Sequence, residues 1–309
     1  MQQLENILTQ ISDIVWGYPL LILLFGTHIF LTFRLRFIQR FIGKAIKISL
    51  SKNKEGEGDI SQFGALTTAL AATIGTGNIV GVSTAIAAGG PGAVLWMWLT
   101  GVFGIATKYS EALLSVKYRV TTKNGLMAGG PMYVLERGLN MKWLAILFAA
   151  FTSVSAFGIG NMVQANSISH MVNDSFGISY WITGLILAVL TAFVIIGGIK
   201  SIAKVCENLV PFMAIFYILG CIILLFINYS TVPQTLALIF ESAFSGHAVM
   251  GGFVGAGMKE AIRYGIARGL FSNESGLGSA PIVAAAAQTK NPVRQALVSS
   301  TGTFWDTVV

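Results

Sequence analysis

The sequence predicts an all-α polytopic membrane protein, and three observations carry the prediction. Hydrophobic residues make up 54% of the 309 residues and charged residues only 11%, whereas a soluble domain carries about 25% charged residues. Several stretches approach the roughly 20 apolar residues that cross a bilayer, among them 14–33, 181–198 and 211–227. The basic residues are confined to alternate loops, as the orientation below shows. An ordinary soluble domain is therefore excluded.

The elements follow in order along a single transmembrane domain, 1–309. An outer helix at 14–33 and a basic amphipathic stretch at 34–54 come first. Core segments are then expected at 60–88, 92–117, 141–172, 180–198, 202–227 and 236–258. A glycine- and alanine-rich loop should lead to a seventh core segment beginning near Gln295. Because its apolar run has barely begun at Val309, we expect the chain to be incomplete at its C-terminus.

The positions of lysine and arginine set the orientation. Four loop regions and their edges hold 19 of the 20 basic residues: 34–54, 117–142, 200–204 and 259–294. The remaining one, Lys108, lies inside a core segment near Glu111, and the opposite connections carry no basic residue. The sequence therefore predicts a multi-pass protein of the inner (plasma) membrane with its N-terminus outside. The net charge of +7 then faces anionic lipid headgroups, and a nucleic-acid partner is not indicated.

The first core segment carries a signal for a broken helix. Gly75 and Gly77 each disfavour a helix by about 1 kcal/mol relative to alanine, and Asn78 is a good N-cap for a helix that restarts at Ile79. Unwound backbone at membrane depth is tolerated only inside protein or beside a water-filled cavity. The alternative is that the glycines simply permit close helix packing. A phosphate-binding loop is disfavoured because no strand precedes them.

The chemistry of such a break suits a zwitterion and a cation. Freed amides at Thr76 and Gly77 can hold a carboxylate, helped by the positive end of the restarted helix. A hard cation such as sodium prefers oxygen ligands, which freed carbonyls and side-chain oxygens would supply. The candidate cation ligands are Ala71, Thr73, Ile74 and Asn78.

Later segments offer partners for the break. Gln164 presents a donor and an acceptor in mid-helix, although it can equally act as a polar contact between helices. Phe244, Ser245 and Gly246 lie in a second candidate break, and two breaks in corresponding positions of two halves mark the midplane site of inverted-repeat transporters. Asp306 is a functional candidate because ionisable groups in membrane segments are costly.

Two motifs resemble a known family. The stretch Thr73-Ile-Gly-Thr-Gly-Asn-Ile79 and the stretch Arg268-Gly-Leu-Phe-Ser-Asn-Glu-Ser-Gly-Leu-Gly-Ser-Ala-Pro281 resemble the alanine or glycine:cation symporter family. The resemblance implies a LeuT-type fold of inverted five-helix repeats with an added outer helix. The first repeat would span 60–227, and 236–309 would begin a truncated second one. It also implies the substrate site at Thr76, Gly77, Gln164 and the break near Ser245, and the cation near Ala71.

The expected function is therefore secondary active transport of a small neutral amino acid, alanine or glycine, coupled to sodium or proton entry. No cofactor other than the coupling ion is expected, and the oligomeric state is left open. The alternative is a passive facilitator or channel, but a channel would need a repeated ring of charges or carbonyls. An enzyme is not expected, because the three histidines show no metal-ligand or Ser–His spacing within one segment.

Overall fold

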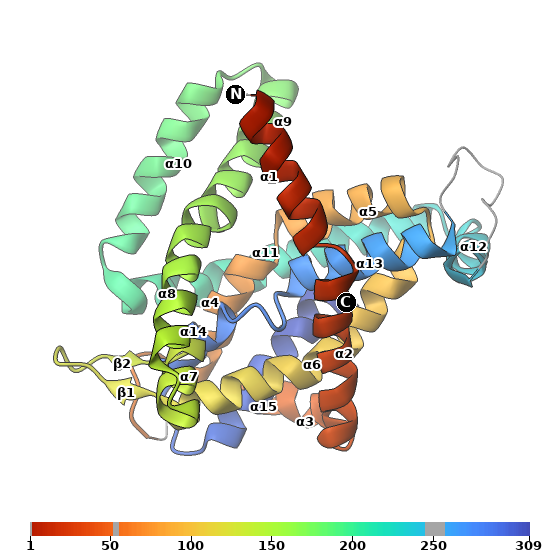
Figure 1. Ribbon diagram of the computed structural model, residues 1–309. Coiled ribbons are helices and arrows are strands. Elements are labelled where there is room, and N and C mark those ends of the chain that lie inside the picture. The colour runs from red at the N-terminus through yellow and green to blue at the C-terminus, as the bar shows by residue number, and fades with distance from the viewer. Residues whose placement is uncertain (1, 52–55, 245–256) are drawn as a thin grey trace.

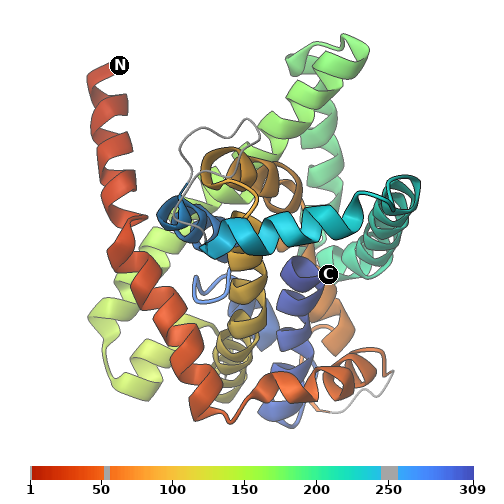
Figure 2. The same ribbon diagram turned by 90° about the vertical axis from the view of Figure 1, so that its right-hand side faces the viewer.

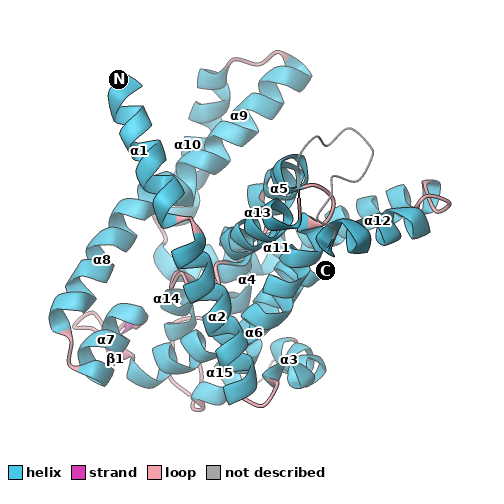
Figure 3. Cartoon of the chain, turned by 45° about the vertical axis from the view of Figure 1, so that its right-hand side comes forward, coloured by secondary structure: helices cyan, strands magenta, loops and turns pink. Residues whose placement is uncertain are grey.

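The chain contains helices that are long and apolar enough to cross a membrane. The computed structural model describes residues 2–51, 56–244 and 257–309, and these residues are largely helical (Figure 1, Figure 3). Two straight segments, Lys142–Phe176 and Gly198–Ile227, meet the length and hydropathy of a span, and two bent helix pairs meet them jointly. This confirms the prediction of a helical membrane protein.

The N-terminal region differs from the single outer helix expected at 14–33. Helix α1 (Gln2–Val15) and helix α2 (Tyr18–Arg34) are separated at Gly17, and Pro19 lies in the first turn of α2. Proline fits at a helix start but not in its interior, so a new helix begins there. The basic stretch that follows forms the short helices η1 (Ile38–Phe41) and α3 (Ile42–Ser49).

The first core segment is broken, as predicted. Helix α4 (Gln62–Thr73) ends at the glycines, and the chain continues as a π-helical turn, η2 (Gly77–Gly81), and helix α5 (Val82–Gly89). The two parts are bent by 49°. The 26-residue helix α6 (Ala93–Tyr118) follows and packs along α2, α13 (Met258–Asn273) and α15 (Pro292–Thr303).

The middle of the chain forms a pair of helices that projects from the bundle, called the arm below, and a helix that lies across the bundle. After α6 come a hairpin of β1 (Val120–Thr121) and β2 (Met127–Ala128) and the helix α7 (Pro131–Leu139). The arm consists of the helices α9 (Val163–Phe176) and α10 (Tyr180–Ile195), which pack together and rise away from the bundle (Figure 1). The remaining elements are α8 (Lys142–Phe157), the π-helix η3 (Gly158–Met162), α11 (Gly198–Ile227) and α12 (Val232–Phe244). Helix α12 lies across the end of the bundle (Figure 2).

The expected loop at 259–294 is wrong. Helices α13 (Met258–Asn273) and α14 (Ala280–Ala285) occupy most of it, and α15 (Pro292–Thr303) and the π-helix η4 (Phe304–Val308) follow. Hydropathy misses α13 because the helix is covered by protein, and small residues matter there more than apolar ones. A Cβ atom on Gly265, for example, would lie 2.5 Å from the Ala93 carbonyl oxygen of α6.

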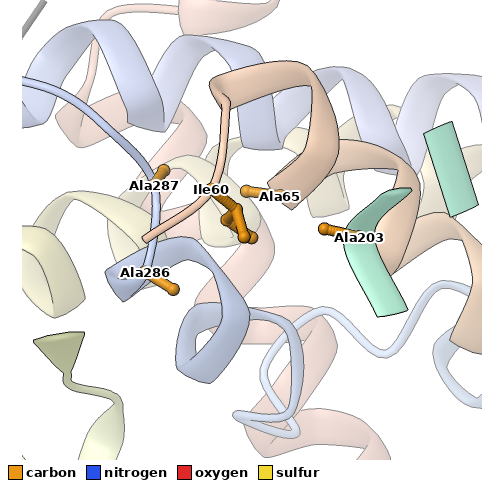
Figure 4. Packing of buried hydrophobic residues seen from close by; sticks show 5 residues of the cluster. All are labelled: Ile60, Ala65, Ala203, Ala286 and Ala287. Atoms are coloured by element: carbon orange, nitrogen blue, oxygen red, sulfur yellow. The ribbon is translucent and has the colours of Figure 1, made fainter. Parts of the chain in front are cut away.

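The broken segment α4–α5 packs against the broken segment α13–α14 along both of its halves. Helix α5 lies against α13, and α4 lies against α14. At the far ends of α4 and α14, Ile60 pairs with Ala287 in a parallel β-bridge, and both contribute to a small core with Ala65, Ala203 and Ala286 (Figure 4). This core holds the two segments together at one end of the bundle.

Arg119 strengthens the same end. Its guanidinium donates hydrogen bonds to the carbonyl oxygens of Ala285 and Ala287 at 2.9 and 2.7 Å, and to those of Glu57 and Thr289 at 2.8 and 3.1 Å. Five fixed N–H donors allow one arginine to bind several carbonyls at once. The start of α4 and the chain after α14 are therefore joined through the end of α6.

Candidate functional site

The first break lies at Ile74–Thr76, between α4 and η2. Ile74 leaves the helical region of backbone space, with ψ at 107°. Residues 74–78 are half-buried, and a Cβ added to Gly75 would meet nothing within 4 Å. The break therefore combines unwound backbone with open space beside it.

Asn78 organises the break in a different way from the predicted N-cap. The side-chain Oδ1 of Asn78 accepts a hydrogen bond from the Gly75 backbone amide at 2.8 Å, and the backbone amide of Asn78 donates to the Gly75 carbonyl at 3.1 Å. An N-cap would instead accept from amides further along the chain, and η2 already begins at Gly77. The N-cap assignment is wrong because the side chain turns backward to hold the broken turn.

This turn frees a carbonyl among the predicted cation ligands. In a continuous helix the Gly75 amide would donate to the carbonyl of Ala71, but it donates to Asn78 instead. Ala71 is exposed and Ile74 is half-buried, whereas Thr73 is buried, with its Oγ1 3.5 Å from the Leu70 carbonyl. Three of the four predicted ligands therefore lie at the C-terminal end of α4, and the fourth, Asn78, lies in η2.

The other face of Asn78 joins the break to two later elements. Its Nδ2 lies 2.7 Å from the Asp306 carbonyl oxygen, 3.2 Å from Asp306 Oδ1 and 3.2 Å from Ser272 Oγ. Ser272 Oγ in turn donates to Asp306 Oδ2 at 3.1 Å. One asparagine therefore connects η2, the last turn of α13 and η4.

Gly77 lies against the same junction. A Cβ atom at this position would be 3.4 Å from Ser272 Cα and 3.5 Å from Ser272 Oγ. These are ordinary contact distances, so alanine fits, whereas a longer side chain would have to displace α13 or fill the space beside the break. Two of the elements meeting here, η2 and η4, are π-helical turns, which are often found at functional sites.

A second break separates α13 from α14 at residues 274–279, inside the stretch that carries the family resemblance. Glu274, Gly276 and Gly278 all have positive φ angles, of 52°, 92° and 83°. A Cβ atom on Gly278 would lie 2.7 Å from a ring carbon of Phe148. This stretch, expected as part of a loop, is instead a short unwound segment between the helices α13 and α14.

Helix α6 supplies polar partners to both ends of the second break. Lys108 is buried and its Nζ donates to the Asn273 carbonyl at 2.8 Å, at the C-terminal end of α13. The Gly276 amide donates to Glu111 Oε2 at 3.1 Å. Lys108 and Glu111 are three residues apart and so share a helix face. A cation at a helix C-terminus and an anion at free amides are both the favourable arrangement.

The remaining predicted substrate residues lie on other elements. Gln164 is on α9, which packs chiefly against α10 and η3, and its Oε1 is buried without a hydrogen-bond partner among the described residues. Phe244 ends α12, exposed over 60% of its surface and packed edge-on against Trp96. Ser245 and Gly246 lie outside the described residues. The structure therefore brings together Thr76, Gly77 and Asn78, with Gln164 and Phe244 on separate helices.

Sequence reasoning missed Ser272, Lys108 and Glu111. A signal for the second break was present, because Gly276-Leu-Gly278 repeats the Gly-x-Gly spacing of Gly75-Thr-Gly77. Hydropathy concealed the signal, since the surrounding segment contains charged residues and reads as a loop.

Broken helices that meet inside a bundle of membrane helices define a class, the transporters whose binding sites lie at helix interruptions. The chain itself belongs to the sodium:alanine symporter family, whose profile matches residues 1–309. It is 54% identical over 311 residues to the sodium/alanine symporter AgcS of Methanococcus maripaludis, covering 98% of this chain and 68% of that protein.

Two further relatives show the range of the family. An uncharacterized transporter of Haemophilus influenzae is 55% identical over 308 residues, covering 99% of this chain and 68% of the relative. The probable sodium/glutamine symporter GlnT of Bacillus subtilis is 40% identical over 317 residues, covering 100% of this chain and 64% of the relative. The chain thus spans about two thirds of the length of these relatives.

Proposed function

We propose that this protein imports a small neutral amino acid, alanine or glycine, together with sodium. The observation that carries the proposal is the first break, where unwound, half-buried backbone and a freed carbonyl lie beside open space in a membrane helix. Family membership supports the coupling ion and the substrate class. Proton coupling is the alternative for the ion, and passive facilitation is the alternative for the mechanism.

The proposed placement of the ligands follows the polarity of the break. The substrate carboxylate binds the amides of Thr76 and Gly77, at the N-terminal end of η2 and α5, where the helix dipole is positive. The sodium ion binds the carbonyl ends of α4, at Ala71 and Ile74, with Thr73 and Asn78 beside them. The contacts predicted for the substrate side chain are still Gln164, Phe244, Ser245 and Gly246.

The proposed fold is a LeuT-type inverted repeat. The packing of α5 on α13 and of α4 on α14 is what two broken helices of opposite direction would give. In this scheme the first repeat spans 60–227 and the second begins near 236, with α13–α14 as a broken helix of the second repeat. The break predicted near Ser245 lies outside the described residues. The end of the bundle at Ile60 and Arg119 faces the cytoplasm of a plasma-membrane protein whose N-terminus is outside.

The test is uptake of radiolabelled alanine into proteoliposomes of the intact protein, with sodium, lithium or proton gradients imposed in turn. One charge moving through 100 mV gains about 2.3 kcal/mol, and a tenfold sodium gradient adds about 1.4 kcal/mol. An inward sodium gradient with a negative interior should therefore concentrate alanine on the order of several hundredfold. Uptake that only equilibrates under every gradient would replace the symporter with a facilitator.

A further inference from the structure

Asp306 is a buried carboxylate at the junction of the two broken segments. It is 7% exposed and lies in the π-helical turn η4. Its Oδ2 accepts hydrogen bonds from Ser272 Oγ at 3.1 Å and Thr307 Oγ1 at 2.6 Å, and its Oδ1 lies 3.2 Å from Asn78 Nδ2. The carboxylate therefore faces the side of the break where Asn78 and Gly77 lie.

Among the described residues, no basic group lies within ion-pair distance of this carboxylate, although Lys108 is close enough to act on it electrostatically. The one ion pair among the described residues joins Lys142 to Glu136, which are far from Asp306 in the sequence. Lys108, which is buried on the neighbouring helix α6, donates its Nζ to the Asn273 carbonyl. Burying a charge that is not paired at ion-pair distance is costly, so a bound proton or cation would stabilise a carboxylate at this place.

The surrounding donors favour the charged form. Ser272, Thr307 and Asn78 each donate to the carboxyl oxygens, and hydrogen bonds donated to a carboxylate stabilise its ionised state. A carboxylate has about four lone-pair positions, and Oδ1 accepts one side-chain hydrogen bond while Oδ2 accepts two. Oδ1 therefore keeps an open position for a further ligand.

We propose that Asp306 Oδ1 binds a monovalent cation at the first break, with Ser272 and Thr307 orienting the carboxylate and Asn78 joining it to the break. The shared chemistry fits two sources, the sodium ion and the ammonium group of the amino acid. The proposal deepens the function proposed above and rests on it. It adds a charged ligand to a site otherwise built from neutral oxygens, which explains how a buried acid is retained in a membrane segment.

The test compares Asp306→Asn with Asp174→Asn in the intact protein. The first variant keeps the size of the side chain and removes its charge, and the second removes a charge from an exposed position at the end of α9. Radioactive sodium is titrated without alanine, and radiolabelled alanine is titrated at saturating sodium. Lactate, which carries a hydroxyl in place of the ammonium group, serves as the competitor of alanine.

If sodium is the ligand, Asp306→Asn weakens sodium binding measured without alanine by about 10- to 100-fold, the range for a hydrogen-bonded charge. If the ammonium group is the ligand, Asp306→Asn weakens alanine binding at saturating sodium by the same factor, and the variant no longer prefers alanine over lactate. Asp174→Asn leaves both affinities unchanged. Ser272→Ala, which keeps the carboxylate but loses a donor, shifts the same affinity in the same direction by a smaller factor.

Several outcomes overturn the site. Sodium and alanine affinities of a folded Asp306→Asn within about twofold of wild type would show that no cation binds there. A variant changed only in the pH dependence of transport would make Asp306 a proton carrier. If Asp306→Asn does not fold, Ser272→Ala with unchanged affinities overturns the site. If the wild-type protein binds neither sodium nor alanine, the proposed function is overturned as well. If the wild-type protein binds both and Asp306→Asn binds them equally well, only the site at Asp306 is overturned.

Discussion

The two breaks share a Gly-x-Gly spacing but differ in what surrounds them. At the first break, residues 74–78 are half-buried, and Gly75 has open space around its Cα. At the second break, Gly276 is exposed, but Gly278 is buried and a Cβ atom on it would meet Phe148. Lys108 and Glu111 also bind the backbone of the second break, through the Asn273 carbonyl and the Gly276 amide.

The difference indicates a division of roles. A break whose free carbonyls and amides are already bound by protein side chains has little capacity left for a ligand, because each group is satisfied. A break with free groups beside open space keeps that capacity. The first break is thus suited to binding, and the second to holding α13 and α14 in position. The predictions below test this contrast.

The largest effect should come from blocking the first break. Gly77→Leu places a side chain in the space beside Ser272 and the amides of the break, so sodium-driven alanine uptake should fall to background. Gly77→Ala should retain transport, because its Cβ meets Ser272 at ordinary contact distance. The matched control is Gly220→Leu, since nothing lies within 4 Å of a Cβ there. Near-normal uptake by Gly77→Leu, with expression unchanged, would remove the ligand from this break.

The next effect concerns stability and compares one glycine from each break. Gly278→Ala should destabilise the protein by about 2–4 kcal/mol, from the positive φ and from the contact with Phe148. Gly75→Ala should change the unfolding free energy by less than about 1 kcal/mol, because its Cβ has room. Thermal unfolding of both variants in detergent is the measurement. Equal losses in the two variants would contradict the contrast between a fixed and an open break.

A smaller effect is expected from the side chains that hold the second break. Lys108→Met and Glu111→Gln should each destabilise the protein by about 1–3 kcal/mol, because each leaves backbone groups without a charged partner. The double variant should lose less than the sum, since neither charge is then left uncompensated in a buried setting. The same unfolding measurement forms the double-mutant cycle. Strictly additive losses would mean that the two residues act independently.

The smallest effect should follow from removing the side chain that organises the first break. Asn78→Ala loses the hydrogen bond to the Gly75 amide and the link to Asp306. Each such bond contributes about 1 kcal/mol, so the half-saturating sodium concentration for alanine uptake should rise about fivefold to thirtyfold. Alanine affinity should fall with it, because linkage makes the two bindings reciprocal. An unchanged sodium dependence would place the cation elsewhere.

The two breaks also show where prediction from sequence succeeds. The first break was predicted because Gly75, Gly77 and Asn78 interrupt a strongly apolar run, so the local signal stands out against hydropathy. A second break was predicted near Ser245, which lies outside the described residues, and the interruption at 274–279 was not predicted. The segment that contains it starts with Lys259 and Glu260 and was interpreted as a loop, because charged residues lower its hydropathy.

The polar junction shows a second limit. Asp306 was a candidate from its position in an apolar run, but its partners Asn78 and Ser272 lie 228 and 34 residues away along the chain. No periodicity within one segment contains that information. The same holds for Lys108, which was expected inside a core segment, whereas its burial and its contact with Asn273 were not predicted.

By itself, the sequence determined that this protein is helical, lies in a membrane and breaks its first core segment at Gly75–Gly77. These properties follow from local preferences: transfer of side chains into lipid, and the backbone freedom of glycine. The tertiary structure alone decided which groups satisfy each break, that α13 is a covered helix, and that Asp306 faces Asn78. Those outcomes depend on packing between distant segments, where a buried polar group must find its partner in space and not along the chain.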